Sequence, residues 1–158
     1  MNKQKKLIKK LGILFVMLIM SVTVLSTTIA SAATAPTVSF SFAIPELGAL
    51  TKTTQSYKRN TDTVNDAWAI TFETSNEPAL LSKTKSTFWL GVNNPSGVNP
   101  MGSKKYIVKE GSGWENLTAL PAASQKYVLL YASDNGTTND EYSAGGRWTP
   151  NSGNKPNR

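Results

Sequence analysis

The sequence contains neither cysteine nor histidine among its 158 residues. Without histidine, the chain lacks the commonest general base near neutral pH and the commonest metal ligand. Without cysteine, it can form no disulfide and offers no thiolate nucleophile. The two absences exclude Ser-His-Asp and Cys-His catalytic sites and leave almost no usual ligands for zinc. We therefore expect a non-catalytic protein that carries no cofactor and no metal.

Acidic residues are also few, ten in all, although two carboxylates are enough to build a glycosidase. The sequence places no pair of them on adjacent strands, and Asp140 and Glu141 lie in a predicted loop. Ser82 and Lys85 form an S-x-x-K pattern, but the two motifs that accompany it in penicillin-binding enzymes are missing. A carboxylate-dependent, glycan-active enzyme is therefore the weaker alternative to a binding protein.

The N-terminal region has the three parts of a secretory signal peptide. Met1–Lys10 carries five lysines and no acid, Leu11–Leu25 is almost wholly apolar, and small residues follow. This pattern predicts a helical signal peptide over residues 1–32, cleaved after Ala32 or, equally well, after Ala33. A retained membrane anchor is less favoured, because serine and threonine dilute the apolar stretch below the roughly 20 residues that a spanning helix needs. We expect the remaining chain to be secreted.

The high formal charge of the chain comes mainly from this leader. The whole sequence has a net charge of +7, whereas residues 33–158 keep 12 basic and 10 acidic residues, a net charge of +2. A near-neutral domain gives no reason to expect a nucleic-acid partner. We expect contact with a membrane only through the leader before cleavage.

Residues 33–158 are predicted to form a single all-β domain. Threonine favours strands, whereas asparagine and glycine favour turns, and no amphipathic helix separates the alternating segments. We predict an antiparallel β-sandwich or barrel of about six to eight short strands. The expected strands are 37–44, 67–72, 86–92, 104–109, 117–120, 125–132 and 145–149. The stretch 46–64 reads as a loop with a possible edge strand at 56–59, and 79–81 as one turn of helix.

The segment Asp134–Glu141 is rich in the oxygen ligands that calcium prefers. Its spacing fits no EF-hand, and a loop of this composition is also typical of a plain turn between strands. The sequence leaves both interpretations open.

Tryptophan is the residue type that most suggests a ligand. Trp68 alternates in phase with apolar neighbours and is expected in the core, whereas Trp89 is out of phase and Trp114 follows a glycine-rich turn. Exposed tryptophans on a β-sandwich can form a platform for sugar rings, but they can equally be buried or cover a sheet edge. Trp89, Trp114 and Trp148 are the candidates for such a platform, together with Arg147.

The segment Gly146-Arg147-Trp148-Thr149-Pro150-Asn151-Ser152 resembles the ending G-x-W-S-P-D-S of a family of small secreted proteins of Gram-positive bacteria, a domain of unknown function. Thr149 and Asn151 replace the serine and aspartate of that ending. The resemblance implies export and a β-rich fold, and it implies no activity. Physically, Pro150 fixes the backbone after Trp148, so the indole is expected to lie over the sheet as a structural latch with Arg147 at its margin.

These features together favour a secreted, extracellular binding domain without catalysis. Its expected partner is a cell-wall or environmental glycan, or another extracellular protein. The alternatives are a bacteriocin-like antagonistic protein and the carboxylate-dependent enzyme described above.

Overall fold

The computed structural model describes residues 36–45, 49–60, 66–77, 84–135, 141–154 and 157. All of them belong to the compact unit Ala32–Arg158. The predicted signal peptide and the predicted helical turn at 79–81 lie outside the described residues, as do the S-x-x-K serine and most of the Asp134–Glu141 loop.

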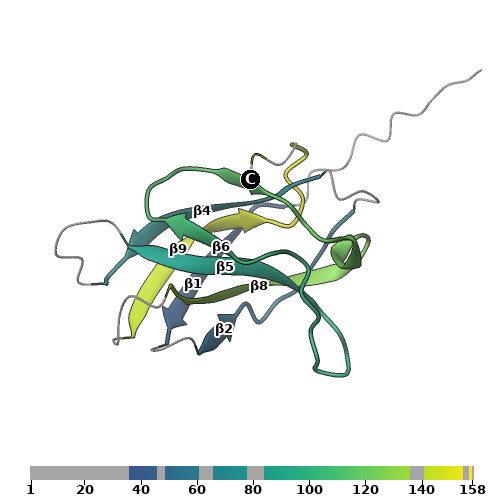
Figure 1. Cartoon of the computed structure of the whole chain (residues 1–158), viewed down its shortest axis with the longest axis horizontal. Coiled ribbons are helices and arrows are strands. Elements are labelled where there is room, and N and C mark those ends of the chain that lie inside the picture. The colour runs from purple at the N-terminus through teal and green to yellow at the C-terminus, as the bar shows by residue number, and fades with distance from the viewer. Residues whose placement is uncertain are drawn as a thin grey trace, which may run out of the picture. The chain divides into compact units, whose positions relative to one another are not determined.

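The described residues form two antiparallel sheets that pack on each other (Figure 1). Sheet A has the strand order β1-β9-β4-β7, and sheet B has the order β2-β8-β5-β6, with β3 also paired to β8. The strands are β1 (Val38–Ile44), β2 (Leu50–Lys52), β3 (Tyr57–Lys58), β4 (Trp68–Ser75), β5 (Lys85–Val92), β6 (Tyr106–Lys109), β7 (Glu115–Leu117), β8 (Tyr127–Asp134) and β9 (Tyr142–Thr149).

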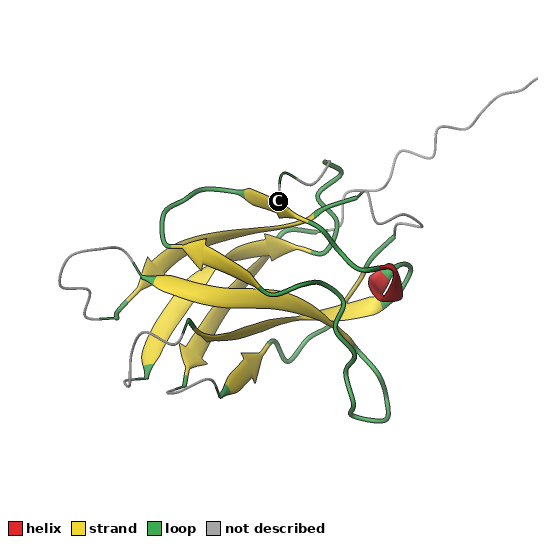
Figure 2. Cartoon of the chain, viewed as in Figure 1, coloured by secondary structure: helices red, strands yellow, loops and turns green. Residues whose placement is uncertain are grey.

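The all-β prediction is confirmed, and the two separate sheets make the fold a sandwich and not a closed barrel. Figure 2 shows strands joined by loops, with one short 3-10 helix at Pro121–Ala123. Within the described ranges, no helix is long and apolar enough to cross a membrane.

The strand count is nine in the described part of the chain, against a prediction of about six to eight. The extra element is the three-residue β2, which lies in a stretch that was predicted as loop. The predicted strand 117–120 is displaced, because β7 spans Glu115–Leu117. In β7 only Leu117 is buried, opposite Trp68, so its two polar residues gave no apolar signal for a strand.

Strand pairing is mostly long-range. Among the described strands, only β5 and β6 are both consecutive in sequence and hydrogen-bonded to each other. Apart from β2 and β3, which both pair with β8, the other consecutive strands lie in different sheets. β9 fills the position between β1 and β4. Sheet A is therefore complete only when segments from both ends of the domain meet.

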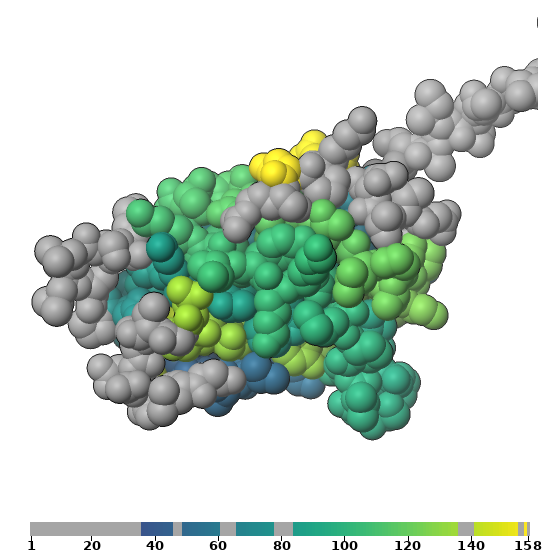
Figure 3. Space-filling model, viewed as in Figure 1, coloured from purple at the N-terminus to yellow at the C-terminus, as the bar shows by residue number. Residues whose placement is uncertain are grey.

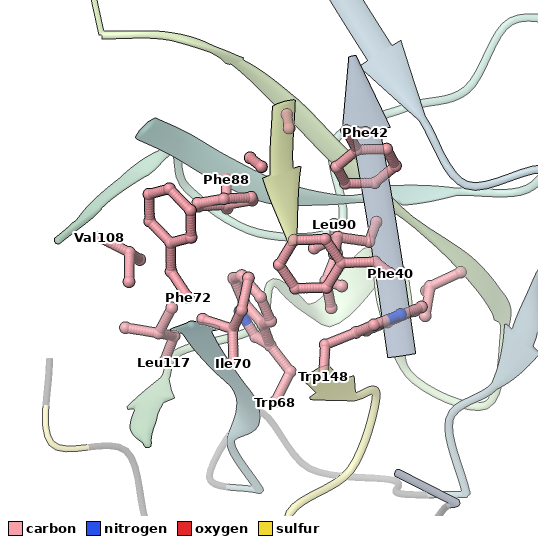
Figure 4. Packing of buried hydrophobic residues seen from close by; sticks show 14 of the residues in the cluster. Phe40, Phe42, Trp68, Ile70, Phe72, Phe88, Leu90, Val108, Leu117 and Trp148 are labelled. Atoms are coloured by element: carbon pink, nitrogen blue, oxygen red, sulfur yellow. The ribbon is translucent and has the colours of Figure 1, made fainter. Parts of the chain in front are cut away.

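The core lies between the sheets and is rich in aromatic rings (Figure 4). Alternate residues of β1, β4 and β5 point inward, as the period of a strand requires. Phe88 of sheet B packs against Phe40 and Phe72 of sheet A, with both pairs of ring centroids 5.6 Å apart. These contacts hold the two sheets together. The outer face of each sheet is not part of this core.

Candidate functional site

The structure separates the four residues that the sequence singled out. Trp148 is fully buried in the core, and Trp89 is only 5% exposed on the outer face of sheet B. Trp114 is 42% exposed, and Arg147 lies beside it with its guanidinium carbon 5.6 Å from the centre of the indole. The four residues thus do not form one platform, and only Trp114 and Arg147 come together.

Trp148 does not lie over the outside of the sheet as expected. Its indole packs inside the sandwich, with its ring centre 5.7 Å from that of Tyr57 in an edge-on arrangement. Arg147 precedes it in β9 and therefore points to the opposite face of sheet A, since successive side chains of a strand alternate. The residue that fixes the chain after Trp148 is a different one, Arg59.

Arg59 is a buried arginine that ties an early segment to the chain after β9. Its Nη1 donates to the backbone carbonyl of Pro150, and its Nη2 donates to the carbonyl of Asp66 over 2.8 Å. Burial lowers the pKa of Arg59 to about 10, and the charge of Asp66 opposes this shift. The guanidinium is therefore charged at neutral pH and holds the segment that follows Thr149 in place.

Trp114 reaches the outer face of sheet A by a turn that carries the chain from β6 to β7. Gly113 has a φ of +82°, a conformation that only glycine adopts without strain. The Gly111 amide donates to the Phe72 carbonyl over 2.7 Å, which anchors the turn to β4. Arg147 in turn contacts Trp114 and donates from Nε to the Glu73 carboxylate over 2.8 Å. Three side chains from three segments therefore meet on one face.

Next to Trp114 lies a hollow of about 330 Å³. Its floor is Ala69 of β4, which is paired with Thr149 of β9 on one side and with Asn116 of β7 on the other. The side chain of Ala69 is smaller than those of its two polar neighbours. The surface of the sheet is therefore depressed at Ala69, and this depression is the hollow. Its lining residues are Thr37, Ala69, Trp114, Asn116, Thr149, Asn151, Ser152 and Asn154.

The segment after β9 forms one rim of this hollow because it is held by backbone hydrogen bonds. The Ser152 amide donates to the Ala67 carbonyl over 2.8 Å, and the Ala67 amide donates to the Asn154 carbonyl over 3.0 Å. The Asn157 amide donates to the Asn116 carbonyl over 2.9 Å. Residues far apart in the sequence are thus fixed around one concave surface.

The chemistry of the lining is polar and uncharged, with one aromatic wall. Hydroxyl and amide groups can each donate and accept hydrogen bonds, which suits a ligand that does the same. Asn151 is fully buried, and its side-chain nitrogen and oxygen have no hydrogen-bond partner in the described structure. A buried amide without a hydrogen-bond partner is uncommon. The Asn151 amide therefore offers the hollow one further donor group and one further acceptor.

Two further hollows are less suited to a ligand. One follows the β1 edge and the segment 51–57, and the other lies at the end of β4, around Thr74 and Ser75. Neither is lined by a tryptophan. In the described ranges, no group of three acidic side chains is placed to hold a metal ion, and most of the loop behind the calcium hypothesis lies outside those ranges.

Sequence reasoning missed most of the hollow. Thr37, Ala69, Asn116 and Asn154 come from four segments, and no sequence motif links them. Only the glycine-rich turn before Trp114 signalled that this tryptophan leaves the core. The other residues are brought together by strand register, which one sequence does not reveal.

Comparison with protein-family models gives no match, and no curated protein matches the chain. Among solved structures, the chain is similar to one titled "Crystal structure of PirA", with 11% sequence identity and a TM-score of 0.38. The match covers 69% of this chain and 92% of that one. The likeness is too distant to support a conclusion about function.

Proposed function

We propose that this chain is a secreted, non-catalytic binding domain and that the hollow beside Trp114 binds a neutral sugar residue of an extracellular or cell-surface glycan. The observation that carries the proposal is the pairing of a half-exposed indole with a lining of hydroxyl and amide groups. Export is supported by the leader pattern of residues 1–32.

A sugar ring has an apolar face and a rim of hydroxyl groups, and the hollow offers a counterpart to each. The Trp114 indole supplies a flat apolar wall. Asn116, Ser152 and Asn154 supply groups that can both donate and accept hydrogen bonds. The volume of about 330 Å³ lies at the small end of ligand pockets, which suits one ring of a longer chain.

The uncharged lining favours a neutral sugar over an anionic one. Among the described residues, Arg147 is the cation in contact with Trp114, and its Nε is engaged by the Glu73 carboxylate at 2.8 Å. Because the two side chains neutralise each other, they leave little net charge to attract an anionic ligand. Their role in the proposal is to hold the indole in position through the contact between Arg147 and Trp114.

The test is a binding screen with insoluble peptidoglycan and neutral polysaccharides, followed by titration with fragments of any polymer that retains the protein. A ring stacked on Trp114 should change the tryptophan fluorescence, since this is the most exposed of the tryptophans in the described structure. Trp114→Ala should weaken binding by more than about tenfold, as expected for a central aromatic anchor.

Tyr127→Ala is the matched control, because Tyr127 is also an exposed aromatic residue but belongs to sheet B. It should bind like the wild type. The proposal is wrong if no glycan retains the wild-type protein, or if Trp114→Ala binds as tightly as the control. Release of reducing sugar from a bound polymer would instead support the enzymatic alternative.

A further inference from the structure

The described lysines are unevenly distributed over the two sheets. All seven of them lie on strands of sheet B or in the segments that lead into those strands, and all are exposed. They are Lys52, Lys58, Lys85, Lys104, Lys105, Lys109 and Lys126. The small net charge of the domain therefore conceals a strongly basic side.

Five of these lysines share the outer face of sheet B. Phe88 and Leu90 of β5, Val108 of β6 and Tyr57 of β3 pack in or against the core, so the residues between and beside them point outward. The lysines at these outward positions are Lys52, Lys58, Lys85, Lys105 and Lys109. In the described part of the sheet, no aspartate or glutamate occupies an outward strand position. We call this surface the lysine face.

An aromatic pair forms the middle of the lysine face. The rings of Trp89 and Tyr131 stack with their centres 5.4 Å apart. The Lys105 ammonium lies 4.7 Å from the centre of the Trp89 indole, and the Lys52 ammonium lies 5.7 Å from the centre of the Tyr131 ring. Lys52, Tyr131, Trp89 and Lys105 thus form one row across the sheet, with a lysine at each end. Each ammonium group is held over an aromatic ring by a cation–π interaction.

The neighbouring strands contain a second unusual pair. Lys85 of β5 and Lys109 of β6 lie directly opposite each other, an arrangement that destabilises a sheet through repulsion of like charges. A surface that binds negatively charged groups would relieve this repulsion. The pair therefore points to an anionic partner.

Exposed aliphatic side chains lie among the lysines. Leu50 is 57% exposed, Ile107 48% and Met101 44%. Ile107 is paired with Thr87, Leu50 is paired with Ser133, which is itself paired with Thr87, and Met101 is paired with Gly91. Because Thr87 and Gly91 are outward positions of β5, all three apolar residues lie on the lysine face. Much of the surface seen in Figure 3 belongs to the green part of the chain, which includes β6. A soluble polyanion would gain from the lysines alone. A lipid surface would gain from both groups, because aliphatic side chains enter the interfacial layer while lysines attract anionic headgroups.

We propose that the lysine face is a docking surface for an anionic lipid membrane. The face lies on sheet B, whereas the hollow beside Trp114 lies on sheet A, so the proposal does not depend on the proposed glycan site. The domain would rest on the lipid through one sheet and keep the opposite sheet available to a ligand.

The experiment is co-sedimentation of residues 32–158, which form a compact unit of their own, with vesicles of phosphatidylglycerol and, separately, of phosphatidylcholine. We expect binding to phosphatidylglycerol that weakens with added salt, and no binding to phosphatidylcholine. The double variant Lys85→Gln/Lys109→Gln should bind about 30-fold more weakly, the loss expected for two lysines at an anionic surface. It should melt no lower than the wild type, because it removes a repulsive pair.

The matched control is Lys104→Gln/Lys126→Gln, which changes the charge equally at lysines outside the outward strand positions. It should lose much less affinity. Ile107→Thr should weaken vesicle binding without changing its salt dependence, since it removes only apolar contact. The proposal is wrong if both vesicle types bind equally or neither binds, or if the control loses as much as the Lys85/Lys109 variant. It is also wrong if inorganic polyphosphate binds the protein while phosphatidylglycerol vesicles do not.

Discussion

Gly146 of β9 lies so close to Thr71 of β4 that a Cβ atom at position 146 would be 2.1 Å from the Thr71 carbonyl oxygen. The same atom would be 2.9 Å from the ring of Phe40, which occupies the space left by the missing side chain. The glycine thus lets the central strand of sheet A pass between a backbone and a core ring.

Replacing this glycine should damage the fold severely. Gly146→Ala forces an atom against backbone, which has little freedom to move, so we expect a loss above about 3 kcal/mol in the free energy of unfolding, beyond the usual range for overpacking. Gly91→Ala is the comparison, because the atoms nearest to its Cβ would belong to the side-chain ring of Tyr131, the first of them at 2.3 Å. A ring can swing aside, so the Gly91 variant should lose clearly less. Urea unfolding of both variants measures the difference, and equal losses would contradict the explanation.

Replacement by alanine should reduce stability much more at Trp148 than at Trp114. Trp148→Ala removes a fully buried indole and should lower the free energy of unfolding by about 3–5 kcal/mol. Trp114→Ala removes an indole that is 42% exposed and should cost no more than about 1 kcal/mol. Thermal unfolding of both variants provides the measurement, and Trp148→Phe replaces the alanine variant if that one does not fold. A larger loss at Trp114 than at Trp148 would show that Trp114 serves mainly to stabilise the fold.

Arg59 should contribute to stability through the carbonyl groups that it holds. Arg59→Met keeps the buried volume but leaves the Pro150 and Asp66 carbonyls without their donor. We expect a loss of about 2–5 kcal/mol, because each buried carbonyl left without a partner costs about 1–3 kcal/mol and removal of the buried charge offsets part of that cost. Denaturant unfolding measures the loss.

The same variant should also release the segment after Thr149. Carboxypeptidase or a low dose of protease should then remove that segment faster than in the wild type. An unchanged digestion rate would show that the backbone hydrogen bonds between Ala67 and residues 152 and 154 are sufficient by themselves.

Alkaline pH should weaken the fold through Tyr142. Burial raises the pKa of its phenol to about 12, the hydrogen bond with Ser86 opposes this, and the charges of Asp134 and Glu77 add to it. Since the unfolded phenol loses its proton near pH 10, the unfolded state binds fewer protons between pH 10 and 12, and the free energy of unfolding falls across that window.

Tyr142→Phe should therefore show a smaller fall than the wild type between pH 10 and 12. At neutral pH it should lose about 1 kcal/mol, because the 2.8 Å hydrogen bond with Ser86 is gone. Arg59 titrates in the same window in both proteins, so its effect cancels in the difference. Tyr127→Phe, at an exposed position, should follow the wild type, and a variant curve parallel to the wild type would refute the assignment to Tyr142.

The fold class followed from local patterns, and the strands that were predicted best are the most regular. In β4 and β5, inward and outward residues alternate over several positions around Trp68 and Phe88, so the period of two was visible. β2 and β7 are three residues long and mostly polar. They are strands because a neighbouring strand pairs with them, and nothing in their own residues indicates which strand that is.

The functional surfaces were harder to predict, for a related reason. The total charge of residues 33–158 is close to balance, and a total says nothing about which face each lysine occupies. The spacing of Lys105, Ile107 and Lys109 did carry a signal, since alternate residues share one side of a strand. The opposition of Lys85 and Lys109 depends on register, which only the structure supplies.

The placement of β9 between β1 and β4 has a consequence for the order of events in folding. β1 has no neighbour within its sheet until about a hundred more residues have been synthesised, so sheet A cannot assemble progressively as the chain grows. Proteins dominated by such distant pairings fold slowly. For a domain that we propose is exported, this delay is useful, because a chain that has not yet folded can still be threaded through a translocation channel. Strand order would thus keep the domain unfolded for long enough to be transported, while the leader of residues 1–32 directs the chain to the channel.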